Sequence, residues 1–274
     1  MIQYIDSHAH LTMLDFQTDT FIRLMNDWAN QGLVSILDVG ITAKDVQHRI
    51  ALLEHCRAKS GSQTNLPRIY FSAGIWPSEE AIGDWKKHID ELEIQIKNVP
   101  RDTLVAIGEC GLDRHWNHPE RGSDLRCERE LFAAQLDLAC RYGLPVIVHS
   151  RDAAQETMEV LQDFPEVRGV IHCFSYGPQE ITSFLEQGWY ISFAGNVTYK
   201  NAQELREALQ AADITQILLE TDSPYLAPVP HRGKKANPSM VQYQYELASR
   251  IKNIPLEDLA RQVARNFSTL FIQP

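Results

Sequence analysis

The sequence predicts an α/β fold of the (β/α)8 type, a TIM barrel. Short runs rich in Val and Ile recur about every 25 to 40 residues, and the segments between them have helical periodicity. Ionisable side chains stand at the ends of several of these runs, where a parallel barrel collects its functional groups. A doubly wound open sheet is the alternative, but no G-x-G-x-x-G motif follows the first expected strand.

Eight segments are expected as strands. They are short, apolar and rich in β-branched residues, which is typical of strands buried on both faces of a parallel sheet. In chain order they are Ile2–His8, Leu33–Gly40, Ile69–Ile75, Leu104–Glu109, Pro145–His149, Gly169–Cys173, Trp189–Phe193 and Ile217–Asp222.

Two of the intervening segments have clear helix boundaries. Asp124–Arg141 places leucines on a charged background and stops before Gly143 and Pro145, which is typical of a helix C-terminus. Pro178–Gln187 begins with proline in the first turn and ends before Gly188. These segments are therefore expected to be helices of the barrel's outer layer.

Length and composition favour one domain. With 44% hydrophobic residues and no linker-like stretch, residues 1–274 are expected to form a single barrel domain.

No secretory signal pattern or membrane-spanning apolar run is present, so a cytoplasmic protein is expected. The five cysteines are dispersed, which argues against disulfides and a cysteine zinc site. A net charge of -10 disfavours general adhesion to polyanions, and no obligate protein partner is inferred.

The first expected strand carries a D-x-H-x-H motif formed by Asp6, His8 and His10. Side chains alternate along a strand, so these three are expected on one side, with the imidazoles roughly 7 Å apart at the backbone. Two imidazoles at this spacing can bind one transition-metal ion, whereas Asp6 is expected to position them. By itself the motif also fits an exposed polar strand end.

Other expected strands also end in metal-ligating side chains. In a barrel these ends share one rim, so the side chains are expected to converge there. Each one alone also fits a hydrogen-bonded core histidine, a helix cap or an ion pair. Their joint placement predicts a two-metal site. The full set is His8, His10, Glu109, His149, His172 and Asp222.

Five motifs occur in order along the chain. They are Asp6-Ser7-His8-Ala9-His10, Gly108-Glu109-Cys110-Gly111-Leu112-Asp113, Pro145-Val146-Ile147-Val148-His149-Ser150-Arg151, His172-Cys173-Phe174-Ser175 and Glu220-Thr221-Asp222-Ser223-Pro224-Tyr225-Leu226. Together they resemble the TatD-type metal-dependent deoxyribonuclease family of the amidohydrolase superfamily. One departure is that Tyr176 intervenes between Ser175 and Gly177, where the family reads H-C-F-S-G, and this affects the loop beside His172.

The resemblance implies a TIM barrel with one or two divalent ions, Zn, Mn or Mg, at its C-terminal mouth. It also implies hydrolysis of DNA from single-stranded 3′ ends by a metal-activated water. Two ligand groups with one shared carboxylate are implied, namely His8, His10 and Asp222 for one ion, His149 and His172 for the other, and Glu109 as the bridge.

The predicted site suits an anionic substrate. Its two carboxylates would offset four positive charges from two ions, which leaves about +2. Two such ions would supply a nucleophilic water, with Asp222 as general base and Glu109 as the second catalytic carboxylate. Arg151, Lys200 and Arg232 follow expected strands and are predicted to bind substrate phosphate.

Three functions remain open at this stage. The first is a nuclease that acts on single-stranded DNA ends. The second is a small-molecule amidohydrolase or lactonase with the same metal site, and the third is a non-catalytic metal-binding interaction protein. Replacing Asp222 by Asn should abolish turnover in either enzyme and leave partner binding unchanged in the third.

Overall fold

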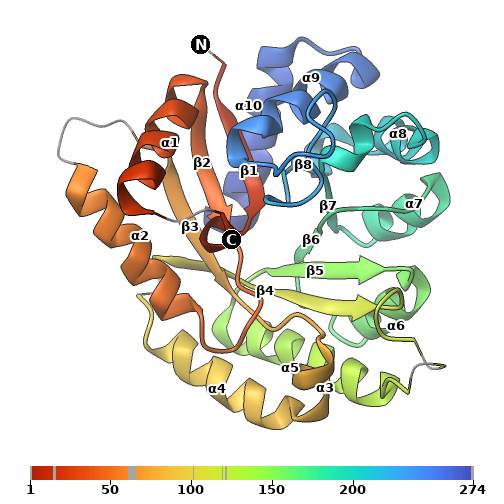
Figure 1. Cartoon of the computed structure of the whole chain (residues 1–274). Helices are drawn as coiled ribbons and strands as arrows, with labels where there is room; N and C mark the ends of the chain where they lie inside the picture. The colour runs from red at the N-terminus through yellow and green to blue at the C-terminus, as the bar shows by residue number, and fades with distance from the viewer. Residues whose placement is uncertain are drawn as a thin grey trace.

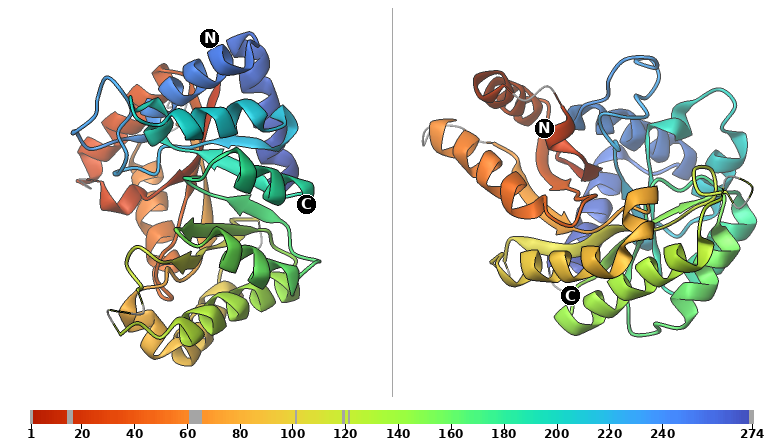
Figure 2. Two further views of the ribbon diagram at one scale, coloured as in Figure 1. Left: turned by 90° about the vertical axis from the view of Figure 1, so that its right-hand side faces the viewer. Right: turned by 60° about the horizontal axis from the view of Figure 1, so that its bottom comes forward.

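Eight parallel strands follow one another round a nearly closed barrel in the order β1 to β8, and helices cover the outside (Figure 1). Figure 2 shows the same arrangement from two further sides. The computed structural model describes residues 2–14, 17–60, 66–100, 102–118, 120 and 122–272. The predicted (β/α)8 fold is therefore confirmed. No helix in this described part of the chain is long and apolar enough to cross a membrane.

All eight strands lie where the sequence predicts them, with differences at their ends. The first begins at Tyr4 rather than Ile2, and the fourth continues past Glu109 to Asp113. The strands are β1 Tyr4–Ala9, β2 Leu33–Asp38, β3 Arg68–Ala73, β4 Leu104–Asp113, β5 Val146–Arg151, β6 Gly169–Ile171, β7 Tyr190–Phe193 and β8 Ile217–Leu219.

Both predicted helices are present. In α5 the side chain of Asp124 caps the first turn by accepting a hydrogen bond from the backbone N–H of Cys127, and left-handed Gly143 ends the helix. The helices are α1 Thr18–Asn30, α2 Val46–Ser60, α3 Glu79–Gly83, α4 Trp85–Lys97, α5 Leu125–Tyr142, α6 Ala154–Gln162, α7 Pro178–Glu186, α8 Gln203–Ala211, α9 Val241–Lys252 and α10 Leu256–Phe267. Shorter helical turns are η1 Leu11–Met13, η3 Gly195–Thr198, η4 Ile214–Gln216, η5 Pro238–Met240 and η6 Ser268–Ile272.

The barrel closes where β8 meets β1. Ala9 and Ser223 form a parallel bridge, and the backbone N–H of His10 donates to the carbonyl of Ser223 at 2.8 Å. The N–H of Asp222 in turn donates to the carbonyl of His8 at 2.9 Å. Closure therefore brings residues more than 200 positions apart in the sequence side by side at the C-terminal rim.

The C-terminal helices support this seam from outside. Helices α9 and α10, blue in Figure 1, lie next to red β1. The buried hydroxyl of Tyr245 on α9 donates to the carbonyl of Ile5 at 3.1 Å and accepts from its N–H at 3.2 Å. Because β1 carries the D-x-H-x-H motif, the end of the chain helps to fix its beginning.

A buried ion pair supports the rim beside β1. The guanidinium of Arg49 on α2 donates to the carboxylate of Asp38 at 2.6 Å and to that of Asp45 at 3.0 Å. Asp38 also accepts a hydrogen bond from the backbone N–H of Leu11 at 2.8 Å. The pair therefore joins the end of β2 to the segment that follows His10.

Candidate metal centre

The six predicted ligands converge at the C-terminal ends of their strands. The structure arranges them in two groups, and within each group the ligand atoms lie within 4.8 Å of one another. Their side chains are buried or nearly so, and His149 and Asp222 are the most exposed, at 15% each. The groups are His8, His10 and Asp222, and Glu109, His149 and His172.

Glu109 lies between the two groups. Its Oε1 is 2.9 Å from His149 Nδ1 and 3.1 Å from His172 Nε2. Its Oε2 is 3.4 Å from His8 Nε2 and 3.7 Å from His10 Nε2. Each carboxylate oxygen therefore faces one pair of imidazoles, which is the arrangement that a bridging ligand requires.

The spacing of the nitrogens fits a metal ion in each group. The Nε2 atoms of His8 and His10 are 3.3 Å apart, and so are His149 Nδ1 and His172 Nε2. Two nitrogens bound to one tetrahedral ion at the usual zinc distance would be roughly 3.3 Å apart. A set of four imidazoles and two carboxylates is also suitable for Zn or Mn.

The electrostatics of the centre favour a bound cation. Burial raises the pKa of Glu109, but the charge of His172 and the hydrogen bonds from His149 and His172 outweigh burial and hold this pKa well below its usual range. Burial lowers the pKa of His172, yet the carboxylate of Glu109 raises it well above the usual value. The negative charge that favours a proton on His172 favours a metal ion equally, and a bound ion would displace that proton.

Asp222 is ionised at neutral pH. Burial raises its pKa, but the hydrogen bond with His10 and the charges of His8 and His10 bring it below its usual value. His8 differs from its neighbours, because burial and repulsion by His172 lower its pKa. A neutral imidazole beside an ionised carboxylate is the pair of states that metal coordination needs.

Two carboxylates that sequence reasoning did not single out orient the histidines. Asp113 Oδ2 is 2.9 Å from His149 Nε2, and Glu220 Oε1 is 3.4 Å from His172 Nδ1. Each carboxylate contacts the ring nitrogen that faces away from Glu109, so it fixes the tautomer that leaves the other nitrogen free. The alternation of side chains along a strand is a signal that could have found both residues. Asp113 lies four positions after Glu109 and Glu220 two before Asp222, and residues an even number of positions apart point to the same side of a strand.

The carboxylate of Asp6 contacts backbone N–H groups and a hydroxyl, and no hydrogen bond to an imidazole is found for it among the described residues. Its Oδ1 accepts from the N–H of Thr221 at 2.9 Å and from that of His8 at 3.3 Å, and its Oδ2 accepts from the Thr221 hydroxyl at 2.6 Å. The buried carboxylate thus joins β1 to the residue before Asp222. We infer that Asp6 positions the backbone on both sides of the seam.

Local backbone geometry aims the ligands at the rim. The register of β4 against β5 shifts between Gly108 and Cys110, so Glu109 occupies a bulge, and its N–H donates to the carbonyl of Gly40 at 2.8 Å. Gly108 has φ +136°, and a Cβ there would lie 2.6 Å from the carbonyl oxygen of Ile147, so only glycine fits. Asp222 itself has a left-handed φ of 54°, a strained conformation that often marks functional positions.

Five of the six ligands, all but the fully buried His8, line a cavity of about 660 Å³, a size typical of small-molecule sites. Of the three residues predicted to bind phosphate, the structure brings Arg151 to its wall. Lys200 and Arg232 are exposed and are not among the residues that line it. The guanidinium of Arg232 lies over the ring of Tyr199, 4.5 Å from its centroid.

Tyr176, the residue that departs from the family pattern, fixes the loop after β5. Its hydroxyl lies 2.8 Å from the hydroxyl of Ser150 and accepts a hydrogen bond from the N–H of Ala153 at 3.0 Å. Burial raises the pKa of Tyr176 to about 12, so it remains a neutral phenol. Because Arg151 lies between its two partners, Tyr176 holds the segment that carries this guanidinium.

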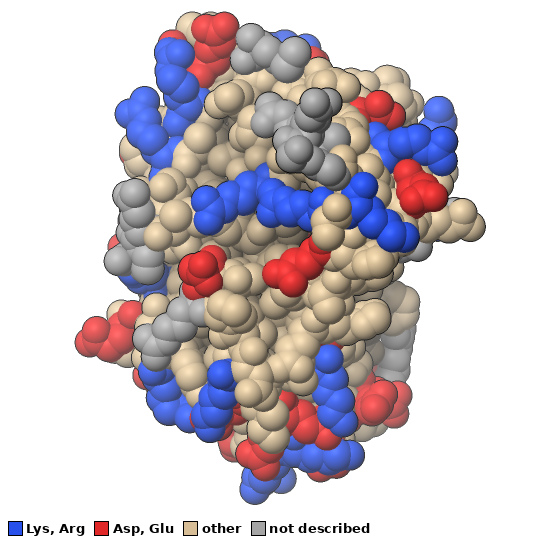
Figure 3. Space-filling view, turned by 90° about the vertical axis from the view of Figure 1, so that its left-hand side faces the viewer, with Lys and Arg blue, Asp and Glu red and all other residues tan. Residues whose placement is uncertain are grey.

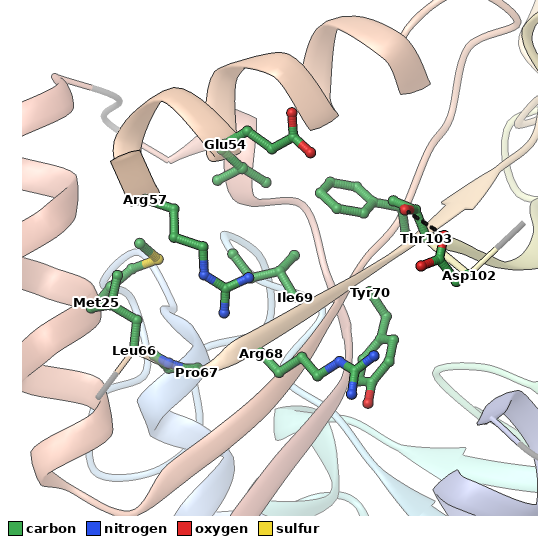
Figure 4. Close-up of a pocket in the computed structure, with 12 residues that line it drawn as sticks. Met25, Glu54, Arg57, Leu66, Pro67, Arg68, Ile69, Tyr70, Asp102 and Thr103 are labelled. Carbon is green, nitrogen blue, oxygen red and sulfur yellow. Dashed lines mark hydrogen bonds between the residues drawn. The ribbon is translucent and has the colours of Figure 1, made fainter. Parts of the chain in front are cut away.

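A second cavity of about 180 Å³ lies at the opposite end of the barrel, where β3 and β4 begin. Figure 3 shows the face on the side of α1 and α2, where a band of Lys and Arg side chains has Asp and Glu side chains close by. In the close-up of Figure 4, Arg57 and Arg68 share the smaller cavity with the carboxylates of Glu54 and Asp102. Among the described residues that line this cavity the charges are balanced and none is a histidine, so we assign the chemistry to the larger cavity.

Comparison with known proteins identifies the family. The family model described as TatD related DNase matches residues 5–272. The chain belongs to the TatD-related DNase family. The predicted resemblance to TatD proteins is therefore confirmed. The chain is also 34% identical, over 97% of its length and 95% of the relative's, to the uncharacterized metal-dependent hydrolase YcfH of Escherichia coli K12.

Other TatD relatives match over nearly the whole chain. The uncharacterized metal-dependent hydrolase TatD of Mycobacterium tuberculosis is 31% identical, with 93% of each chain covered. Among solved structures, the TatD homolog YjjV of Escherichia coli K12 has a TM-score of 0.82 at 27% identity, and the match covers 99% of this chain and 98% of that one. The chain is thus a member of a family whose named relatives are metal-dependent hydrolases.

Proposed function

We propose that this chain is a metal-dependent nuclease that hydrolyses phosphodiester bonds of DNA from the 3′ end of a single strand. The observation that carries the proposal is the arrangement of Glu109 at the cavity. Each of its two oxygens faces one pair of imidazoles, and the facing nitrogens of each pair are 3.3 Å apart, a spacing that fits a shared metal ion. A pair of divalent ions bound there would lower the pKa of a water and neutralise charge on the phosphoryl oxygens. Membership of the TatD-related DNase family supports DNA as the substrate.

The residues of the chain have distinct roles in the proposed reaction. His8, His10, His149 and His172 would hold the ions, with Glu109 shared between them. Asp222 lines the cavity as an ionised carboxylate, so it can accept the proton of a water that attacks phosphorus. Arg151 lies on the wall of the same cavity, where its guanidinium can bind a non-bridging phosphate oxygen.

The net charge of the site makes Arg151 important for binding an anionic substrate. Asp113 and Glu220 bring two further carboxylates to the centre, so two divalent ions would leave a formal charge near zero instead of +2. Attraction of an anion would then depend on the guanidinium of Arg151 together with the charge that bound ions would supply. Lys200 and Arg232 would contact only more distant phosphates of a longer strand.

The proposal is tested with protein of known metal content. The purified chain is depleted of metal, reloaded with Zn, Mn or Mg, and incubated with a 5′-labelled single strand, on which attack from the 3′ end gives a ladder of shortening products. Asp222→Asn should abolish the ladder, whereas Asp137→Asn, which changes an exposed carboxylate on α5, should leave it intact. A folded, metal-loaded protein that leaves the strand uncut with all three ions would refute the proposal.

The cavity volume supports a second candidate, a small-molecule amidohydrolase or lactonase. A cavity of about 660 Å³ can enclose a small ester or cyclic amide without any polymer. A panel of lactones and cyclic amides, assayed beside the labelled strand under the same conditions, separates the two. Turnover of a panel member with the strand uncut would favour the second candidate.

We also propose that the protein acts in the cytoplasm. All five of its cysteines are free thiols, and two of them, Cys127 and Cys140, are at least partly exposed. Cys173 is also partly exposed, so three of the five thiols are accessible to some degree. Free, accessible thiols are usual in a reducing compartment. Fractionation of cells with an antibody against the chain tests this, and recovery in a secreted fraction would contradict it.

A further inference from the structure

Two aromatic side chains stand exposed at the mouth of the metal cavity. Among the residues that the structure describes, four large apolar side chains are exposed, and Trp116 at 56% and Tyr225 at 53% both line this one opening. Single exposed apolar residues are ordinary on protein surfaces. Two that line the same entrance to a metal centre point to a ligand with an apolar face.

The two rings flank the mouth from opposite sides. Trp116 follows β4 and Tyr225 follows β8, and these strands are four positions apart in the order of the eight-stranded barrel. The strands, and with them the loops that carry the rings, therefore lie across the barrel from each other. A flat group entering the cavity between them would meet one ring on each side.

The backbone of each aromatic residue is anchored to a residue of the metal centre. The backbone N–H of Trp116 donates to Asp113 Oδ1 at 2.8 Å, while the other oxygen of Asp113 contacts His149. The N–H of Tyr225 donates to the carbonyl of Asp222 at 2.9 Å, and its ring centroid is 6.3 Å from that of His10. The backbone positions from which the two rings project are therefore held in a fixed relation to the two groups of ligands.

The loop that carries Trp116 is firmly held. The neighbouring side chain of Asn117 donates to the carbonyl of Pro77 at 2.7 Å and to the buried carboxylate of Glu128 at 2.9 Å. Glu128 also accepts from the N–H of Asp113 at 2.9 Å. The exposed indole thus projects from an ordered scaffold, and pre-organisation of this kind reduces the entropy that binding costs.

We propose that Trp116 and Tyr225 form an aromatic clamp that stacks on the nucleobase next to the bond to be cleaved. The inference rests on the proposed nuclease function and deepens it, because it names the base as a determinant of recognition. The phosphate would lie at the floor, beside the metal ligands and Arg151, and the base at the rim. Stacking depends on the flat face that every base has, so the clamp does not require a particular sequence.

The test compares a base with its absence. A 5′-labelled single strand ending in an ordinary 3′ nucleotide is paired with the same strand ending in a base-free tetrahydrofuran residue, and kcat/KM is measured on both. The native protein should prefer the base between about 5- and 150-fold, the range of alanine effects on base stacking. Trp116→Ala and Tyr225→Ala should reduce this preference towards unity, and Trp116→Phe should retain much of it.

Ile94→Ala is the matched control, since Ile94 is as exposed at 57% but lies on α4, outside the cavity. It should keep the full preference. Equal rates of the native protein on both strands, or an equal loss on both strands in the alanine variants, would overturn the clamp. Either result would leave the proposed function standing, because the strands would still be cut.

A binding measurement separates the clamp from the nuclease. Calorimetry of the metal-loaded protein with deoxyadenosine monophosphate and with deoxyribose 5-phosphate should show tighter binding of the nucleotide, by the same factor, and Trp116→Ala should remove the difference. If the native protein cuts no DNA, the nuclease proposal fails. The comparison of the two ligands then still shows whether the two rings bind a base. Equal binding of the two ligands would overturn the clamp, and tighter binding of an aliphatic lactone than of the nucleotide would assign the rings to the small-molecule candidate.

Discussion

Replacement of Asp113 by Asn should selectively weaken the ion site at His149 and His172. Both oxygens of the buried Asp113 carboxylate accept a hydrogen bond, one from the ring of His149 at 2.9 Å and the other from the N–H of Trp116 at 2.8 Å. Asparagine has nearly the same shape but only one acceptor oxygen. One of the two donors must therefore lose its partner.

The size of the effect follows from these contacts. If the amide oxygen stays with Trp116, the amide NH2 faces His149 and favours the tautomer with its proton on Nδ1, the nitrogen 2.9 Å from Glu109 Oε1. That nitrogen could then bind an ion only after losing its proton. If the amide turns round, the N–H of Trp116 is left unpaired instead, at a cost of about 1–3 kcal/mol. Loss of such an orienting partner typically weakens metal binding about 10- to 100-fold.

A competition titration measures this effect. Metal-free protein is titrated with Zn²⁺ against a chromogenic chelator, and the two binding steps are compared with those of the native protein. The step assigned to His149 and His172 should weaken about 10- to 100-fold, while that of His8, His10 and Asp222 changes little. The control is Asp137→Asn on the exposed face of α5. Asp113→Asn protein that is folded and binds two ions as tightly as the native chain would refute the reasoning.

Three further outcomes are expected. Removal of metal with a chelator should lower Tm. Ions present at 100 times their Kd contribute about 2.7 kcal/mol to the free energy of unfolding, which for a chain of this size corresponds to roughly 5 °C or more. Calorimetric scans with and without Zn²⁺ that coincide would contradict this. Arg49→Leu should lower the free energy of unfolding by about 3–5 kcal/mol in urea titrations, since it leaves the buried Asp38 without its partner. By contrast, Arg129→Leu, which breaks the exposed pair with Glu159, should cost no more than about 1 kcal/mol, and similar losses in the two variants would count against the role of burial. Tyr176→Phe removes the hydroxyl that contacts Ser150 and Ala153, so it should lower the free energy of unfolding by about 1–2 kcal/mol. It should also raise KM for a phosphodiester while kcat stays nearly unchanged. Unchanged stability and KM would show that this hydroxyl does not hold the Arg151 segment.

Local sequence pattern was sufficient for the strands and for the rim. Most strands are short apolar runs, and several have an ionisable residue at the expected end, so segments such as Ile217–Asp222 carry both signals within six residues. Because parallel strands share one C-terminal edge, the order of these ends alone indicated that His8, Glu109 and Asp222 would meet. Their roles as ligands stay a prediction, which metal analysis will test.

The tertiary structure decided which groups surround those ligands. Strand β4 was expected to end at Glu109, but pairing with β5 extends it to Asp113 and brings that carboxylate to His149. Likewise, Arg151 reaches the cavity wall, whereas Lys200 and Arg232 are not among the residues that line it. All three follow strands in the sequence, so no local pattern distinguishes them.

The D-x-H-x-H segment and the family motifs were thus readable from the sequence alone, because a ligand at a strand end is fixed by local alternation of side chains. The sequence alone does not show that Trp116 and Tyr225 line one opening. Their relation depends on the closure of β8 against β1, where His10 pairs with Ser223, and on the order of the strands that places the two loops on one rim. This placement is set by the packing of the whole barrel, which no local pattern encodes.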